Sequence, residues 1–414
     1  MGFGRIFARQ ATLSRTARLY LAYKFFGTLF FTYPIFYEYA SHSLPPVQIG
    51  MFFSAIGIVS FLLDIPSGIM ADRWSRKRSA IIGALLAAGA PLAVLTGQGF
   101  TSYLLAALLY GGGRAFLSGT LESLIYDHRT VSKEVYRRIN TLEISLGQAG
   151  ILTSSACGGF LFTHNQQLPF VVEAIAGCIT LLLIFGMQEV HKDGFTRPAS
   201  THQKHLLQSI GHLFATPYLR TVVGMGTAFS VMLGMCIQFV NESAMIQHGI
   251  PAASRGLVVS GAGIATLAIL NLFLLRMLHS DSRRIIYLSC GALLAYSLMG
   301  TVWTAAFLTG YLVWCCLNAT SSFVRVMIQD HIPSSHRATV LSSYKSLAIL
   351  VGIAASMATA GLVQATHSPR AAYLLFSGIT TVIIIPCAVW LLTHDIKQRT
   401  RTLVLSAAWS RSQN

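Results

Sequence analysis

The sequence has few charged residues, and acidic residues are especially scarce. Of its 414 residues, 11% are charged and only 14 are Asp or Glu, whereas a soluble domain is typically about one quarter charged. Hydrophobic residues make up 53% of the chain, and the mean hydropathy is +0.59. This composition excludes an ordinary soluble domain and predicts a chain that crosses a membrane several times.

Cysteine and histidine do not show the spacing that metal sites and enzyme centres need. The seven cysteines lie within apolar runs without metal-ligand spacing, so we interpret them as small packing residues. The histidines are scattered without clustered Asp or Ser partners, and the sequence has no Gly-x-x-x-x-Gly-Lys-Ser/Thr loop for ATP. We therefore expect no metal, no cofactor and no enzymatic activity; a polytopic membrane enzyme or receptor is the less favoured alternative.

Apolar runs long enough to cross a bilayer recur along the whole chain. A bilayer core takes roughly 20 helical residues. We predict an all-α membrane protein with twelve spans, which are residues 19–39, 47–70, 79–97, 102–126, 139–162, 168–187, 219–240, 256–275, 284–302, 305–328, 342–364 and 371–392.

Positive charge is distributed as membrane topology requires. The formal net charge is +16, but Lys and Arg are divided among loops instead of gathered on one face, which argues against nucleic-acid binding. Arg255 and Arg370 alone fall on one side of the predicted membrane, and all other loop cations fall on the opposite side. Because cytoplasmic loops carry the excess of Lys and Arg, we expect both termini to be cytoplasmic. The first span lacks a signal-peptide cleavage site and is expected to remain.

The two halves of the chain resemble each other. The segments "PPVQIGMFFSAIGI" from Pro45 and "PAASRGLVVSGAGI" from Pro251 share a proline, two glycines, a serine and an isoleucine. A duplicated six-span unit predicts two pseudo-symmetric bundles with a site between them near the midplane, although chance identity in Gly-rich sequence is an alternative. We predict an N-terminal bundle (1–187), a central cytoplasmic loop (188–217), a C-terminal bundle (218–395) and a basic cytoplasmic tail (396–414).

The loop after the second span carries a recognisable motif. The run Gly68-Ile-Met-Ala-Asp72-Arg73-Trp-Ser-Arg76-Lys77-Arg78 resembles the loop signature of the major facilitator superfamily, with Ser75 where the family usually has glycine. Gly68 is expected to let another helix approach closely. The resemblance implies that this cluster latches the two halves in the outward-facing state; the gating residues that we predict are Asp64, Gly68, Asp72, Arg73, Arg76 and Asp127. A plain topology signal is the alternative interpretation of the cations.

Charges inside spans are the candidates for coupling, because a charge at a span centre costs about 2.5 to 3.5 kcal/mol. Arg114, Ser118 and Glu122 recur every four residues on one expected helical stripe. Arg114 resembles the span-four arginine that takes part in proton transfer in the family, and a purely structural pair with a buried acid is the alternative. Glu122 has Arg325 as its counterpart in the second half, and we predict that the two close the inner gate.

Other candidates lie on the first and fifth spans. Glu143 and Glu38 are alternative proton carriers, and Tyr33 and Tyr37 are expected to contact the cavity. Lys24 is expected to snorkel to the interface, and Glu173, near an outer end, to be solvated. The fifth-span glycines and serines (Gly150, Ser154, Ser155, Gly158, Gly159) resemble the antiporter motif, with Ser-Ser in place of Gly-Pro; ordinary small-residue packing is the alternative.

Together these features predict a secondary transporter of the bacterial inner membrane. The segment Asp64-Ile-Pro66-Ser67 resembles a run found in bacterial drug-efflux members of the family. We therefore predict proton-coupled export of a small, partly apolar compound by alternating access, with a proton-coupled importer of a metabolite or siderophore-like compound as the alternative. The expected partners are the small-molecule substrate, protons and the lipid bilayer, and a monomer would suffice.

Overall fold

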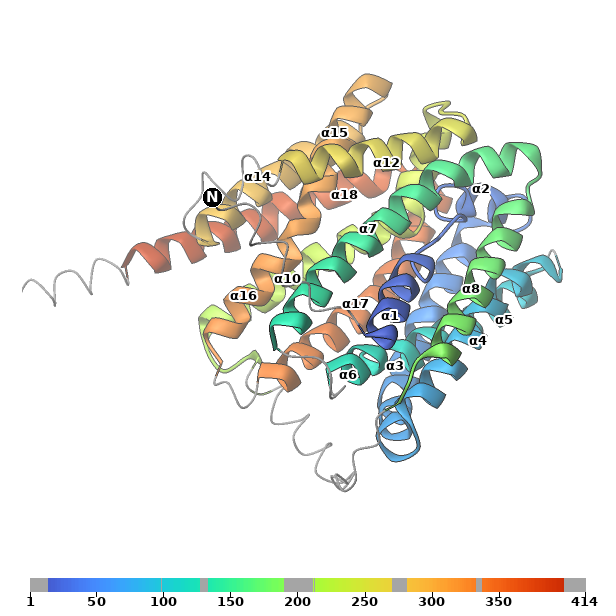
Figure 1. The fold of residues 1–414 in the computed structure, drawn as a ribbon. Helices are drawn as coiled ribbons and strands as arrows, with labels where there is room; N and C mark the ends of the chain where they lie inside the picture. Colours follow the sequence, from blue (N-terminus) through green and yellow to red (C-terminus); the bar gives the residue numbers. More distant parts are fainter. Residues whose placement is uncertain are drawn as a thin grey trace, which may run out of the picture. The chain divides into compact units, whose positions relative to one another are not determined.

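The computed structural model describes residues 14–97, 99–126, 133–189, 211, 213–269, 281–332 and 337–397. These residues are largely helical and none of them lies in a strand (Figure 1). Within these ranges eight helical stretches are long and apolar enough to cross a membrane. The predicted all-α membrane fold is therefore confirmed.

The chain divides into two compact units. Unit 1 is Met1–Pro198 together with Pro251–Ser260, and unit 2 is Ala199–Ile250 together with Gly261–Asn414. The first part of the eighth predicted span thus belongs to unit 1, although the sequence assigns it to the C-terminal bundle. The predicted domain limits otherwise remain a prediction.

Unit 1 is built from helices whose ends follow ordinary capping rules. Ser14 caps α1 by accepting from the Ala17 N–H, and Ser75 caps α4 by accepting from the Arg78 N–H. The helices are α1 (Arg15–Phe26), α2 (Phe36–Ser41), α3 (Pro46–Arg73), α4 (Arg76–Leu95), α5 (Phe100–Leu117), α6 (Thr120–Tyr126), α7 (Lys133–His164) and α8 (Leu168–Gly186).

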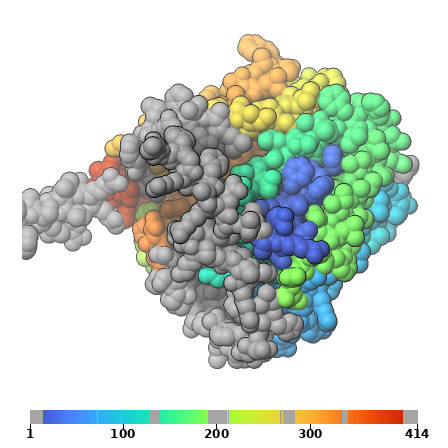
Figure 2. All heavy atoms as spheres, viewed as in Figure 1, coloured from blue at the N-terminus to red at the C-terminus, as the bar shows by residue number. Residues whose placement is uncertain are grey.

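Helix α1 lies between α7 and α8, as Figure 2 shows. Its buried face carries Ala17, Tyr20 and Leu21, which pack with apolar residues of α4, α6, α7 and α8. This packing places Lys24, one turn after Tyr20, beside α6 and α7.

Two predicted spans of unit 1 are interrupted. The first is helical only in α1 and α2, and residues 27–35 between them are not helical. The fourth ends as α5 at Leu117 and restarts as α6 at Thr120, because Gly119 has φ of +68°. Only glycine adopts this left-handed conformation without a steric penalty, so Gly119 sets the position of the break.

Small residues allow α7 to approach its neighbours closely. A Cβ on Gly150 would collide with the Phe25 carbonyl, and a Cβ on Gly159 would collide with the carbonyl of Ala252 at the start of α12. The Ser260 hydroxyl of α12 donates to the Leu152 carbonyl at 2.7 Å. The fifth-span small residues therefore pack backbone against backbone within unit 1.

Unit 2 also contains irregular helical turns within its spans. A π-helical segment, η2, joins α10 to α11, and a second one, η5, follows α18. The elements are α10 (Pro217–Met235), η2 (Cys236–Val240), α11 (Asn241–Gln247), the remainder of α12 (Ala252–Ile269), α14 (Asp281–Met299), α15 (Thr304–Cys316), η4 (Leu317–Ala319), α16 (Thr320–Asp330), α17 (Arg337–Thr366), α18 (Arg370–Ile379) and η5 (Thr380–Ile384).

Candidate functional site

A cluster of one cation and two acids joins three helices of unit 1. The Lys24 ammonium of α1 lies 2.9 Å from Glu122 Oε1 of α6 and 2.5 Å from Glu143 Oε1 of α7. The Tyr20 hydroxyl donates to Glu143 Oε2 at 2.6 Å. We call Tyr20, Lys24, Glu122 and Glu143 the charged cluster.

The charged cluster holds more acid than base. Lys24 is 18% exposed and Glu143 15%, whereas Glu122 is 50% exposed. With both carboxylates ionised and Lys24 charged, the three groups carry one net negative charge. The arrangement can therefore accept one proton or one cationic ligand without leaving Lys24 unpaired.

That Lys24 snorkels to the interface remains a prediction. The structure shows that its ammonium is paired with two carboxylates, which belong to the neighbouring helices α6 and α7. The sequence placed Glu122 and Glu143 among the candidates but missed Lys24 and Tyr20. Their spacing of four residues on one helix is the signal that would have grouped them.

The expected stripe along span four is interrupted. Arg114 lies in the last turn of α5, and Glu122 lies in α6 beyond the break at Gly119. Because α6 does not continue the turn of α5, the repeat of four residues does not place Arg114 and Glu122 on one helical face. Among the described residues, the ion pairs of the charged cluster do not include Arg114. Arg325 is an exposed residue of α16 in unit 2, and its pairing with Glu122 stays a prediction.

The motif loop binds to other parts of unit 1. Arg76 donates to the Ser123 carbonyl of α6 at 2.9 Å. The Lys77 ammonium donates to the Phe185 and Met187 carbonyls at 2.7 Å each, which satisfies carbonyls at the end of α8. The Ser75 hydroxyl donates to Glu189 at 2.5 Å. The loop thus fastens the start of α4 to α6 and to the end of α8.

A latch role of the remaining gating candidates stays a prediction. Asp64 and Arg73 are exposed on α3. A Cβ on Gly68 would meet no described atom within 4 Å, so no described helix of unit 1 packs closely against it. The side chain of Asp72 and all of Asp127 lie outside the described residues.

Glu173 is not solvated, contrary to the sequence-based expectation. It is 7% exposed, and its carboxylate accepts from the Thr32 N–H at 3.0 Å, the Thr32 hydroxyl at 2.8 Å and the Tyr110 hydroxyl at 2.5 Å. Residues 27–35 are not helical, so their N–H groups lack the carbonyl acceptors that a continuous helix would provide. The Glu173 carboxylate accepts from one of these groups, the Thr32 N–H. Gly27 and Pro34 flank the break and were the sequence signal that such an acceptor was needed.

Glu38 lies in a second ion pair. Its carboxylate is 2.6 Å from a guanidinium nitrogen of Arg255, and the Arg255 side chain is only 3% exposed. Glu38 belongs to α2, and Arg255 to the first turn of α12 that packs in unit 1. Tyr37 is buried and Tyr33 half-buried in the same region; their contact with a substrate remains a prediction.

Comparisons with known proteins agree with one another about the fold. The sequence model described as "Major Facilitator Superfamily" matches residues 19–324. The chain is similar to the solved structure of the nucleoside transporter NupG, with a TM-score of 0.73, 13% identity and coverage of 92% of this chain and 98% of that one. It is also similar to the POT family transporter PepTSo (TM-score 0.68, 11% identity, coverage 94% and 99%) and to a D-xylose-proton symporter (TM-score 0.66, 13% identity, coverage 91% and 95%). No curated protein matches the sequence.

Proposed function

The chain belongs to the major facilitator superfamily, and from this premise we propose that it is a proton-coupled transporter whose charged cluster carries the proton. That the chain is a multi-pass membrane transporter and not an enzyme follows from the family. The observation that carries the proposal is the pairing of Lys24 with two carboxylates, 2.9 Å and 2.5 Å away.

Glu143 is the carboxylate that we propose as the proton carrier. It is the less exposed of the two acids, so its charge depends more on Lys24 and less on water. When Glu143 takes a proton, its ion pair with Lys24 is lost while Lys24 keeps Glu122. Protonation would thus loosen α7 from α1 and leave α6 attached to α1, which links a proton to helix movement.

The ion pair between Glu38 and Arg255 supports a separate role for Glu38. Its carboxylate lies 2.6 Å from the buried guanidinium of Arg255 and is the acid of an ion pair that joins α2 to α12. We therefore assign Glu38 to holding α2 against α12, and Glu143 to proton coupling.

The transport direction that we propose is export of a small, partly apolar compound, as the Asp64-Ile-Pro66-Ser67 run indicates. The alternative is proton-coupled import, which is supported by the likeness to a protein described as a D-xylose-proton symporter. We also propose an inner-membrane location with cytoplasmic termini, and a monomer as the working unit.

Substrate-induced proton movement in everted membrane vesicles tests the proposal. A panel of an aromatic cationic dye, glucose and uridine is added while a pH-sensitive dye reports the lumen. For an exporter, we expect a transported compound to enter while protons leave, and the Glu143→Gln variant to lose this exchange. Asp395→Asn, at an acid outside the charged cluster, is the matched control and should behave as wild type. Flux that does not depend on the pH gradient, or a Glu143→Gln variant that keeps the proton exchange, would overturn the proposal. Movement of protons and compound in the same direction would indicate the importer.

A further inference from the structure

Unit 1 contains a cavity that is separate from the charged cluster. Its volume is about 630 Å³, and it lies where α2 leads into α3, α4 into α5 and α7 into α8. Helix α3 runs from this end of unit 1 to the motif loop at its other end, so the cavity and the basic loop lie at opposite ends of α3. With the cytoplasmic loop topology proposed above, the cavity faces the outer compartment.

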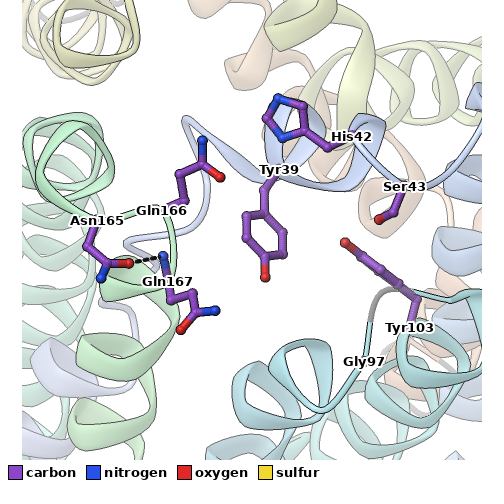
Figure 3. A pocket seen from close by; sticks show the side chains of 8 residues that line it. All are labelled: Tyr39, His42, Ser43, Gly97, Tyr103, Asn165, Gln166 and Gln167. Atoms are coloured by element: carbon purple, nitrogen blue, oxygen red, sulfur yellow. Dashed lines mark hydrogen bonds between the residues drawn. The ribbon is translucent and has the colours of Figure 1, made fainter.

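The cavity wall is polar. Three consecutive carboxamides, Asn165, Gln166 and Gln167, form one side, and the Tyr39 ring stands between them and the opposite side (Figure 3). That opposite side carries the hydroxyls of Ser43 and Tyr103 and the imidazole of His42. Among the described residues the lining has no Lys, Arg, Asp or Glu, so it offers a charged ligand no ammonium, guanidinium or carboxylate as a counter-charge.

These groups match a ligand rich in hydroxyls. Each carboxamide donates and accepts at once, and each phenol and hydroxyl does the same, which suits neighbouring hydroxyl groups on one ring. Tyrosine rings add apolar surface with a polar tip. The volume lies within the roughly 300 to 1,000 Å³ typical of small-molecule sites. We propose that the cavity binds a neutral, polyhydroxylated solute, either a sugar or a nucleoside.

The walls of the cavity are held by contacts of their own. The Tyr103 side chain is 1% exposed, and its ring lies 6.3 Å from Phe36 and 6.1 Å from Phe52. The Tyr39 ring packs 4.6 Å from Phe170, and the Gln167 N–H donates to Asn165 Oδ1 at 2.8 Å. Because these groups are already ordered, a ligand would lose little affinity to immobilising them.

Tyr39 connects the cavity to the ion pair between Glu38 and Arg255. Tyr39 follows Glu38 on the six-residue helix α2, and Glu38 pairs with Arg255. A ligand in contact with Tyr39 therefore contacts α2, the helix that the Glu38–Arg255 ion pair joins to α12. The inference needs neither proton coupling nor transport, so it goes beyond the proposed function and is tested by binding alone.

Equilibrium binding to the purified full-length protein in lipid nanodiscs tests the inference, with tritiated glucose, tritiated uridine and tritiated glutamate as probes. We expect saturable binding of glucose or uridine and none of glutamate. The double variant Gln166→Leu with Gln167→Leu removes two carboxamides from exposed positions; the loss of two hydrogen-bonding groups should weaken binding about tenfold or more. Tyr39→Phe, which removes a single hydroxyl, should weaken it less.

Two further variants separate the cavity from other sites. Gln247→Leu, at an exposed glutamine of unit 2, should bind the probe as wild type does. Absence of saturable binding of both neutral probes, equal binding of glutamate, or wild-type affinity in the double variant would overturn the inference. Binding that falls in Glu143→Gln but survives in the double variant would place the ligand at the charged cluster and also overturn it.

Discussion

Replacing Glu143 by glutamine should destabilise the protein more than the same change at Glu122. Both carboxylates contact the Lys24 ammonium, but Glu143 is 15% exposed and Glu122 is 50% exposed. Each substitution keeps the shape of the side chain and removes its charge, so the difference between the two variants reports how strongly water screens each ion pair.

The expected magnitudes follow from these exposures. Two unit charges about 4 Å apart interact by about 4 kcal/mol at an effective dielectric constant of about 20. Desolvation offsets part of this, and loss of one partner of a buried pair typically costs about 2 to 5 kcal/mol. We expect about 2 kcal/mol for Glu143→Gln, and about 0.5 kcal/mol for Glu122→Gln because exposed pairs contribute little.

Thermal unfolding of the purified variants, followed by tryptophan fluorescence, measures the difference. At about 2 to 4 °C per kcal/mol for a unit of this size, Tm should fall by roughly 6 °C in Glu143→Gln and by less than about 2 °C in Glu122→Gln. Combining each change with Lys24→Met should reveal the larger coupling with Glu143. Equal decreases in Tm in the two single variants would refute the reasoning that the less exposed ion pair contributes more to stability.

Three further predictions concern other parts of the fold. Gly119→Ala should lower Tm by about 2 to 4 °C, because φ of +68° costs an L-residue about 1 kcal/mol. Glu173→Gln should lower Tm by about 4 °C or more, because the amide nitrogen cannot accept from the hydroxyls and N–H that surround it. Burial, and then the charge of Arg370, lower the pKa of His248. The folded state therefore disfavours the protonated imidazole, stability is full above the ordinary pKa of about 6.5 and falls as pH drops below it, and His248→Phe should flatten this acid-side decline in Tm.

Each of these variants has a matched control. Gly224→Ala adds the same methyl group at a helical glycine with open space around it and should not lower Tm; a similar loss there would show that backbone strain at Gly119 is not the cause. Tyr110→Phe combined with Glu173→Gln should recover part of the loss, since it removes one donor. An acid-side decline that persists in His248→Phe would assign it to another group.

Span positions could be predicted from the sequence because bilayer thickness alone fixes the length of an apolar run. The predicted span at 168–187 and the helix α8 (Leu168–Gly186) nearly coincide. Breaks inside spans could not be predicted from hydropathy, because hydropathy is averaged over a window of about 20 residues, which is longer than either break. The break in the fourth span depends on the φ of Gly119, which the surrounding fold sets.

Side-chain partners were predicted less well than helices. Glu122 and Glu143 were found because charges inside spans are rare, but their pairing with one shared cation, Lys24, was not predicted. The reason is physical: the sequence gives the depth of Lys24 in its own span, whereas pairing depends on which helices lie beside α1. Glu173 was misjudged for the same reason, because its acceptor role exists only where the first span is broken.

The π-helical segments of unit 2 have a consequence for chemical labelling. Each five-residue π turn, Cys236–Val240 and Thr380–Ile384, accommodates one more residue than an α turn would. The side chains beyond it are therefore rotated by about 100° relative to an uninterrupted helix. In a cysteine-scanning experiment along the seventh span, the reactive positions before residue 236 and after residue 240 should follow two out-of-phase periodicities, and one continuous helical wheel would assign Asn241 to the wrong side.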